Sequence, residues 1–174
     1  MYRKMLVPLD GSGFAEVVLP YAKELAVRLG VEVVLLHIVS PEERGFFKPL
    51  HRAYIKETVD TIRQQDREVQ IKSGIQTESK PVQVNGEIVV GYPDEEIPRF
   101  AVANGIDLIL MATHDSAVGR HRALGHVAEK VLRQSRIPVW LVRAGVPDAV
   151  SYDKWPKKTL IVTLDGSELA ESVL

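Results

Sequence analysis

The first 39 residues constrain the fold of this chain more than any other segment. Two short apolar runs, Met5–Leu9 and Val31–Val39, flank a stretch, Phe14–Leu29, whose apolar side chains recur at three- and four-residue spacing. That spacing predicts an amphipathic helix. Because Val31–Val39 is apolar at almost every position, it fits a strand covered on both faces, as in a parallel sheet. The segment is therefore predicted to form the strand-helix-strand unit of an α/β fold.

Strands and helices continue to alternate up to residue 143. Further helices are predicted at Pro49–Ile71, Pro93–Asn104 and Gly125–Gln134, and further strands at about Glu87–Val90, Asp107–Thr113 and Ile137–Val142. Asn85-Gly86 is a strong turn signal and is expected just before the third strand. The side chains expected to face the core from the two middle helices are Leu50, Tyr54, Ile55, Val59, Ile62, Ile97, Phe100, Ala101 and Ala103. In such a sheet, ligands bind beyond the carboxyl ends of the strands, where the strand order reverses.

The beginning of the chain is repeated near its end. KMLVPLDGSGFAEVVL, from Lys4 to Leu19, returns as KTLIVTLDGSELAESVL, from Lys158 to Leu174. The spacing between the two copies is that of a whole domain and not of a solenoid repeat. We therefore predict one domain at residues 1–145, a linker at 146–157, and the first strand and turn of a second tandem copy at 158–174. Two interpretations stay open: a tandem protein cut short, or a single domain that reuses the extra strand.

Composition excludes several classes of function. The chain carries 22 basic and 23 acidic residues, so the basic excess typical of nucleic-acid binding is missing. It contains no cysteine, which excludes disulfides, thiolate catalysis and cysteine-based metal sites. No apolar run approaches the ~18 residues of a membrane span, and the amino terminus does not resemble a signal peptide. A cytoplasmic protein that does not bind membranes is predicted.

The sequence offers no motif for catalysis. Nucleophile-elbow, P-loop and dinucleotide-binding glycine patterns are all missing from it. His114, His121 and His126 lie near one another in sequence, but their spacing does not place them on one helix face, and no metal site is predicted. The chain is expected not to be an enzyme, with weak ATP hydrolysis as the upper limit.

Six segments together resemble the universal stress protein family. They are VPLDGS at the first strand, LLHIV at the second, Gly91–Ile97, Leu110–His114, Gly125–Arg133 and Ile137–Arg143. The resemblance implies a doubly wound, five-stranded parallel sheet of order 3-2-1-4-5 with helices on both faces. It also implies a role in stress response and dimerisation, commonly through the last strand. Many members of the family bind ATP or another adenine nucleotide without a known turnover.

The resemblance also implies a nucleotide site, from which this sequence departs in part. The family pattern Gly-x2-Gly-x9-Gly-Ser/Thr allows backbone amides to approach phosphate. Here its positions hold Ala112, Asp115, Gly125 and His126, followed by Val127. Asp115 would place a carboxylate beside the phosphates, and Arg120 and Arg122 are the candidate phosphate contacts that would compensate for it. The other matched positions are Pro8, Leu9 and Val39 around the base and Asp10 near the adenine or ribose.

Each of these assignments has an alternative. Asp10 is equally suited to accept backbone amides within a turn, and Val39 fits plain burial in the core. ATP or another adenine nucleotide, with Mg²⁺, is therefore one expected ligand. The other interpretation is an interaction module whose phosphate loop is degenerate and which binds no nucleotide. Under the family strand order, Ile137–Val142 lies at the sheet edge, so a homodimer through that strand is predicted, with protein partners that the sequence does not identify.

Overall fold

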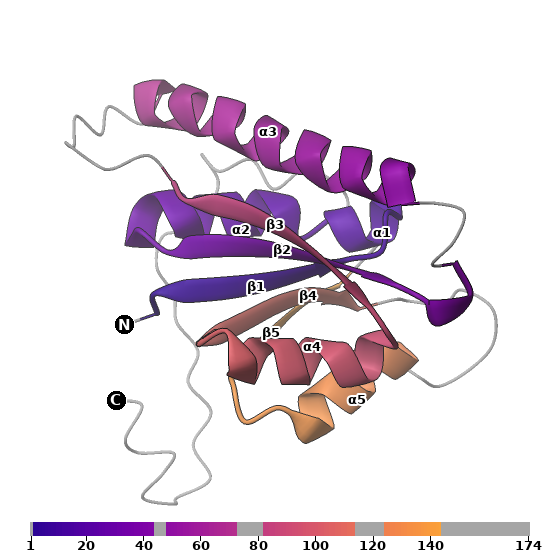
Figure 1. Cartoon of the computed structure of the whole chain (residues 1–174). Coiled ribbons are helices and arrows are strands. Elements are labelled where there is room, and N and C mark those ends of the chain that lie inside the picture. The colour runs from indigo at the N-terminus through magenta and orange to yellow at the C-terminus, as the bar shows by residue number, and fades with distance from the viewer. Residues whose placement is uncertain (1, 44–47, 73–81, 114–123, 144–174) are drawn as a thin grey trace, which may run out of the picture.

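The strands form one parallel sheet in the order β3-β2-β1-β4-β5, as predicted (Figure 1). The computed structural model describes residues 2–43, 48–72, 82–113 and 124–143. The elements follow the chain in this order: β1 Lys4–Leu9, α1 Gly13–Glu16, α2 Leu19–Leu29, β2 Glu32–Val39, the 3-10 helix η1 Pro41–Glu43, α3 Lys48–Lys72, β3 Val84–Val90, α4 Pro93–Ala103, β4 Leu108–Thr113, α5 His126–Gln134 and β5 Val139–Arg143.

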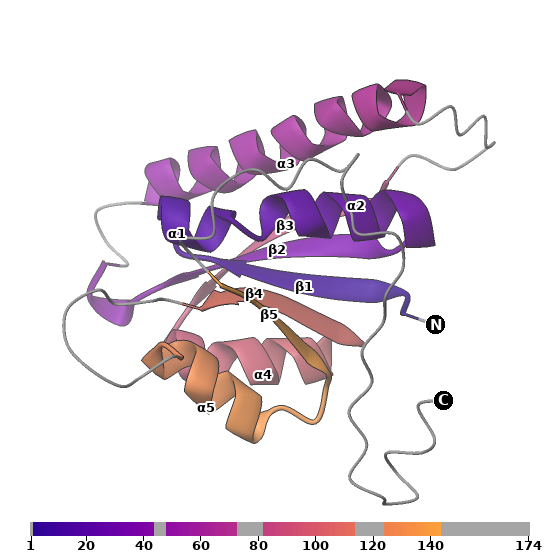
Figure 2. The same cartoon turned by 180° about the vertical axis from the view of Figure 1, so that it is seen from behind.

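Helices cover both faces of the sheet, as the two opposite views show (Figures 1 and 2). Helices α1, α2 and α3 lie on one face, over a core that includes Met5, Val7 and Leu35. Helices α4 and α5 lie on the other face, over a core that includes Leu6, Leu36 and Ile109. Because alternate residues of a strand point to opposite faces, the central strands must be apolar throughout. This is the pattern that the sequence shows in β1, β2 and β4.

The single helix predicted at Phe14–Leu29 is in fact two helices. Helix α1 ends at Glu16 and α2 begins at Leu19, with Pro20 in its first turn. Proline has no backbone N–H, so Pro20 cannot donate to the Glu16 carbonyl as a continuous helix requires. It is tolerated at the start of α2, where that donor has no helical partner anyway.

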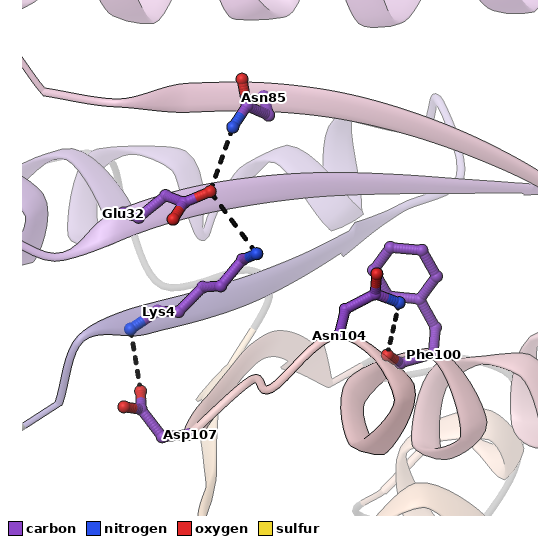
Figure 3. A network of polar contacts seen from close by, with 6 residues as sticks. All are labelled: Lys4, Glu32, Asn85, Phe100, Asn104 and Asp107. Carbon is purple, nitrogen blue, oxygen red and sulfur yellow. Dashed lines mark hydrogen bonds and ion pairs between the residues drawn. The ribbon is translucent and has the colours of Figure 1, made fainter.

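The turn predicted at Asn85-Gly86 is wrong, because both residues lie inside β3. Their register is parallel, with Asn85 opposite Val34 and Gly86 opposite Leu35. The Asn85 amide donates to Glu32 of β2 at 3.0 Å, and Glu32 pairs with Lys4 of β1 at 3.6 Å (Figure 3). The glycine is needed for packing, since a methyl group at this position would overlap Ile55 of α3.

Two residues predicted to face the core are exposed. Leu50 is 65% exposed because the buried stripe of α3 runs through Ile55, Val59 and Ile62 and continues one turn earlier at His51. Ala103 is exposed: the buried residues of α4 are Glu96, Ile97 and Ala101, and Ala103 is the last residue of the helix. Local apolarity alone does not decide which side of a helix faces the core.

Several predictions concern residues outside the described ranges. These are the linker at 146–157, the second copy at 158–174, and the candidate site residues Asp115, Arg120 and Arg122. His114 and His121 are also outside these ranges. Among the helices that the structure describes, none combines the length and the apolar character needed to span a bilayer.

Candidate functional site

The turn that leaves β1 is built by Asp10, Gly11 and Ser12. The Asp10 carboxylate accepts the backbone N–H of Ser12 at 2.8 Å. Gly11 has a φ of 85°, a left-handed conformation that glycine adopts without steric cost. Ser12 then caps α1, and its hydroxyl accepts the N–H of Ala15 at 3.2 Å. The turn therefore holds Asp10 exposed at the carboxyl end of β1.

A cavity of about 400 Å³ opens at the carboxyl ends of the strands. It lies at the reversal of strand order, where β1 is followed in the chain by β2 on one side and pairs with β4 on the other. This is where open α/β sheets bind ligands. The cavity is lined mainly by apolar side chains, with Asp10 and His126 as its ionisable groups; the lining residues are Pro8, Leu9, Asp10, Ala15, Leu36, Ile38, Pro93, Ile97, Met111, Ala112, Gly125, His126, Val127 and Ala128.

The amino end of α5 forms one wall of this cavity. Gly125 is the N-cap residue, and its carbonyl accepts the N–H of Glu129 at 2.9 Å. The amides of the first helical turn have no partners within the helix, and the helix dipole makes this end electropositive. Buried Ala128 and Val131 hold the helix against the sheet. The arrangement can receive an anion beside an apolar cleft.

An ion pair joins the two helices beneath that wall. Lys130 of α5 contacts Asp94 in the first turn of α4. The hydrogen bond from Lys130 lowers the pKa of the Asp94 carboxyl below its ordinary value. The carboxylate therefore stays charged at neutral pH and holds α4 and α5 together at the end that lines the cavity.

The comparisons with known proteins decide the family. Residues 1–143 match the model of the Universal stress protein family. The chain belongs to the universal stress protein family. Universal stress protein MJ0577 of Methanocaldococcus jannaschii is 31% identical over 158 residues, covering 82% of this chain and 96% of that protein. The solved structure of MJ0577 has a TM-score of 0.56 at 28% identity, covering 84% of this chain and 99% of that chain.

Two further solved universal stress proteins share the fold and were determined with nucleotides. One is in complex with cAMP, with a TM-score of 0.61 at 20% identity over 82% of this chain and 98% of that chain. The other, from Archaeoglobus fulgidus, is in complex with dAMP, with a TM-score of 0.55 at 24% identity over 80% of this chain and 97% of that chain.

Seven site residues predicted from sequence meet around the cavity of this universal stress protein. They come from three separate parts of the chain: Pro8, Leu9 and Asp10; Ala112; and Gly125, His126 and Val127. Val39 does not join them: it is buried in β2, opposite Val90, and outside the cavity lining. Val39 is therefore buried, as the alternative interpretation of this residue expected.

Sequence reasoning missed two histidines close to the site. His37 of β2 is buried and lies against His51 of α3, next to Leu9. A signal for His37 was available, because it is the one ionisable residue inside an otherwise apolar run, Val33–Val39. No comparable signal marked His51, which sits among the polar residues at the start of a long helix.

Proposed function

We propose that this universal stress protein is a non-catalytic module that binds an adenine nucleotide at the cavity between β1 and β4 and acts in stress response. The observation that carries the proposal is the cavity itself, which joins an apolar cleft to one exposed carboxylate and one helix amino terminus. A nucleotide has the matching parts: a flat aromatic base, a ribose with hydroxyls, and a phosphate. The complexes of two relatives with cAMP and dAMP support this class of ligand.

The lining residues suggest how such a ligand would lie. Pro8, Ile38 and Met111 offer apolar contacts to the flat base. The exposed Asp10 carboxylate can accept hydrogen bonds from ribose hydroxyls while it keeps its contact with Ser12. At the other end, the amides that follow Gly125 can donate to phosphate oxygens. His126 is exposed there and can add a further donor.

Calorimetry with AMP, ADP, ATP and cAMP, each with and without Mg²⁺, tests the proposal. Asp10→Asn removes the charge but keeps an oxygen that can accept the Ser12 amide, so the turn survives. Loss of a hydrogen bond to a charged group is worth about 1.5–3 kcal/mol, so affinity should fall roughly 10- to 150-fold. Asp60→Asn, on α3 and outside the cavity lining, is the matched control and should change nothing.

Asp115→Gly separates the two interpretations of the phosphate loop. If the unaltered chain binds no nucleotide and Asp115→Gly does, the cavity is competent but its loop is degenerate. The alternative, an interaction module without nucleotide, then holds. If neither protein binds any of the four nucleotides, the proposed function is wrong.

A second candidate function is self-association through β5. This strand lies at the sheet edge, and Trp140 on it is 39% exposed. An apolar edge strand with unused backbone hydrogen-bonding groups is suited to pair with a second copy. Sedimentation should show a dimer that Trp140→Glu dissociates. Val102→Glu, at an exposed apolar position on α4, is the control and should leave the dimer intact; a monomer at all concentrations contradicts this candidate.

A further inference from the structure

A buried histidine of β2, His37, and a half-buried histidine of α3, His51, join the sheet to α3 next to Leu9 of the cavity lining. The His37 side chain is only 4% exposed, and its ring centroid lies 4.7 Å from that of His51. Tyr54, one turn further along α3, meets the His37 ring edge-on at 5.7 Å. The Tyr54 hydroxyl donates to Glu16 of α1 at 3.0 Å. Contacts between polar side chains therefore run from α1 through α3 to β2.

The hydrogen bonds determine which ring nitrogens carry protons. Nδ1 of His37 lies 2.8 Å from the Leu9 carbonyl oxygen, which only accepts, so this nitrogen must donate. In neutral His37, Nε2 is then an acceptor. It lies 2.7 Å from Nδ1 of His51, so His51 must donate from that nitrogen. Both neutral rings are thereby held in the Nδ1–H form.

This geometry tolerates one added proton and excludes a second. A first proton on Nε2 of His51 leaves a single hydrogen between the rings, and the contact persists. A second proton would place hydrogens on both facing nitrogens, 2.7 Å apart, between two cations. The pair must then separate. Burial, with a contribution from His51, already lowers the pKa of His37 from its ordinary value of 6.5, so the folded chain disfavours the charged form.

Some of the charges around the pair favour its protonation, and others disfavour it. Asp10 beyond β1 and Glu43 of η1 favour a protonated His37. Glu16 is bonded to Tyr54, and burial together with Glu16 raises the pKa of Tyr54, which stays neutral. Opposing them, His51 lies in the first turn of α3, where the helix dipole disfavours positive charge and no acidic residue is present.

We propose that His37 and His51 form an acid-operated latch that holds the first turn of α3 on the sheet at neutral pH and releases it on acidification. The release also reaches the nucleotide site, a consequence that rests on the proposed function. Leu9, whose carbonyl is held by His37, lines the cavity and directly precedes Asp10. Loss of the latch therefore loosens the wall from which Asp10 projects.

Hydrogen exchange on the full chain without nucleotide tests the latch. Between about pH 7.5 and pH 5, the interval around an ordinary histidine pKa, the protection factors of residues 52–55, whose amides donate to the carbonyls of the first turn of α3, should fall by about tenfold or more. Protection factors remove the intrinsic pH dependence of amide exchange. Residues 5–7 of β1, which are fully buried, should keep their protection. Protection of α3 that does not change with pH overturns the proposal.

A matched variant identifies the group responsible. In His51→Asn, the side-chain amide nitrogen takes the position of Nδ1 and still donates to His37, but it does not titrate. Protection at neutral pH should persist and its loss on acidification should disappear. His121→Asn, which removes another histidine and alters neither member of the pair, should leave the pH response of α3 unchanged. If the response survives His51→Asn, the latch is not this pair.

Two further measurements use the unaltered chain. The first does not depend on whether a variant folds, and the second tests the link to nucleotide binding on its own. Nitrogen-15 spectra of the unaltered chain at neutral pH should show His37 in the Nδ1–H form, and the opposite tautomer overturns the proposal. Nucleotide affinity is then compared at the two pH values. If no nucleotide binds at either pH, the proposed function fails while the exchange result still decides the latch. If affinity is equal at both, the coupling to the cavity is refuted.

Discussion

Gly86→Ala tests the packing of α3 on β3 at a position where the sequence suggested a turn. Gly86 lies inside the parallel strand β3, and a methyl group there would run into the γ2 methyl of Ile55 and lie 3.2 Å from a methyl of Val59. Both belong to the buried stripe of α3, and Ile55 is branched at Cβ, so its methyl cannot swing away freely. If residues 85–86 formed a solvent-exposed turn instead, alanine would meet nothing.

Two opposing contributions set the change in the free energy of unfolding caused by Gly86→Ala. Forcing a methyl group into a packed site costs about 1–3 kcal/mol. Alanine in place of glycine in a strand returns about 0.5–1 kcal/mol of backbone entropy. Gly86→Ala should therefore lower the free energy of unfolding by about 1–2 kcal/mol. Gly13→Ala is the control, because a Cβ on Gly13 has no neighbour within 4 Å, and it should be neutral or slightly stabilising.

A double-mutant cycle makes the test specific to this contact. Ile55→Ala removes a buried side chain and should cost about 2–5 kcal/mol. In the double variant the new methyl occupies part of the space that Ile55 leaves, so the two losses should sum to about 1–2 kcal/mol more than is observed. Urea unfolding followed by circular dichroism measures all three variants. Strict additivity, or a stabilising Gly86→Ala, would refute the proposed packing of β3 under α3.

Three smaller predictions follow from single contacts. Tyr54→Phe removes the hydrogen bond to Glu16 and should lower the free energy of unfolding by about 1 kcal/mol in urea titrations; no change would mean the bond is unimportant. Asp94→Asn should destabilise the chain near neutral pH. Because Lys130 lowers the pKa of Asp94, the difference in the free energy of unfolding between this variant and the unaltered chain should shrink as pH falls below the ordinary value of 3.8. A constant difference would contradict the pairing. Ser12→Ala removes the cap of α1 and should cost about 1 kcal/mol, measured by thermal unfolding, whereas Ser12→Asp should retain stability.

The alternation of strands and helices was within reach of the sequence because it depends on local signals. The apolar runs at β1, β2 and β4 are each recognised within a few residues. The strand order itself came from the family resemblance and not from these patterns. The seven cavity residues were found the same way, because the family's positions could be laid onto this chain without gaps.

The sequence did not predict features that depend on one position along a helix or on contact with one residue distant in the chain. Asn85-Gly86 is a turn signal in most chains, and only the approach of Ile55, 31 positions earlier, explains why glycine stands inside a strand. Leu50 was expected to be buried because it is apolar. The stripe of α3 instead turns His51 toward the sheet, since the helix is oriented by all its contacts together.

The sequence by itself therefore determined the alternation of strands and helices, the turn at Asp10, and the segments that meet at the carboxyl edge of the sheet. The reason is that periodicity and turn chemistry act between residues close along the chain. Only the tertiary structure decided that Val39 is core, that a cavity exists, and that His37 and His51 share a hydrogen bond across 14 positions. Such contacts depend on how α3 is placed over β2, and that placement is a property of the whole packed domain.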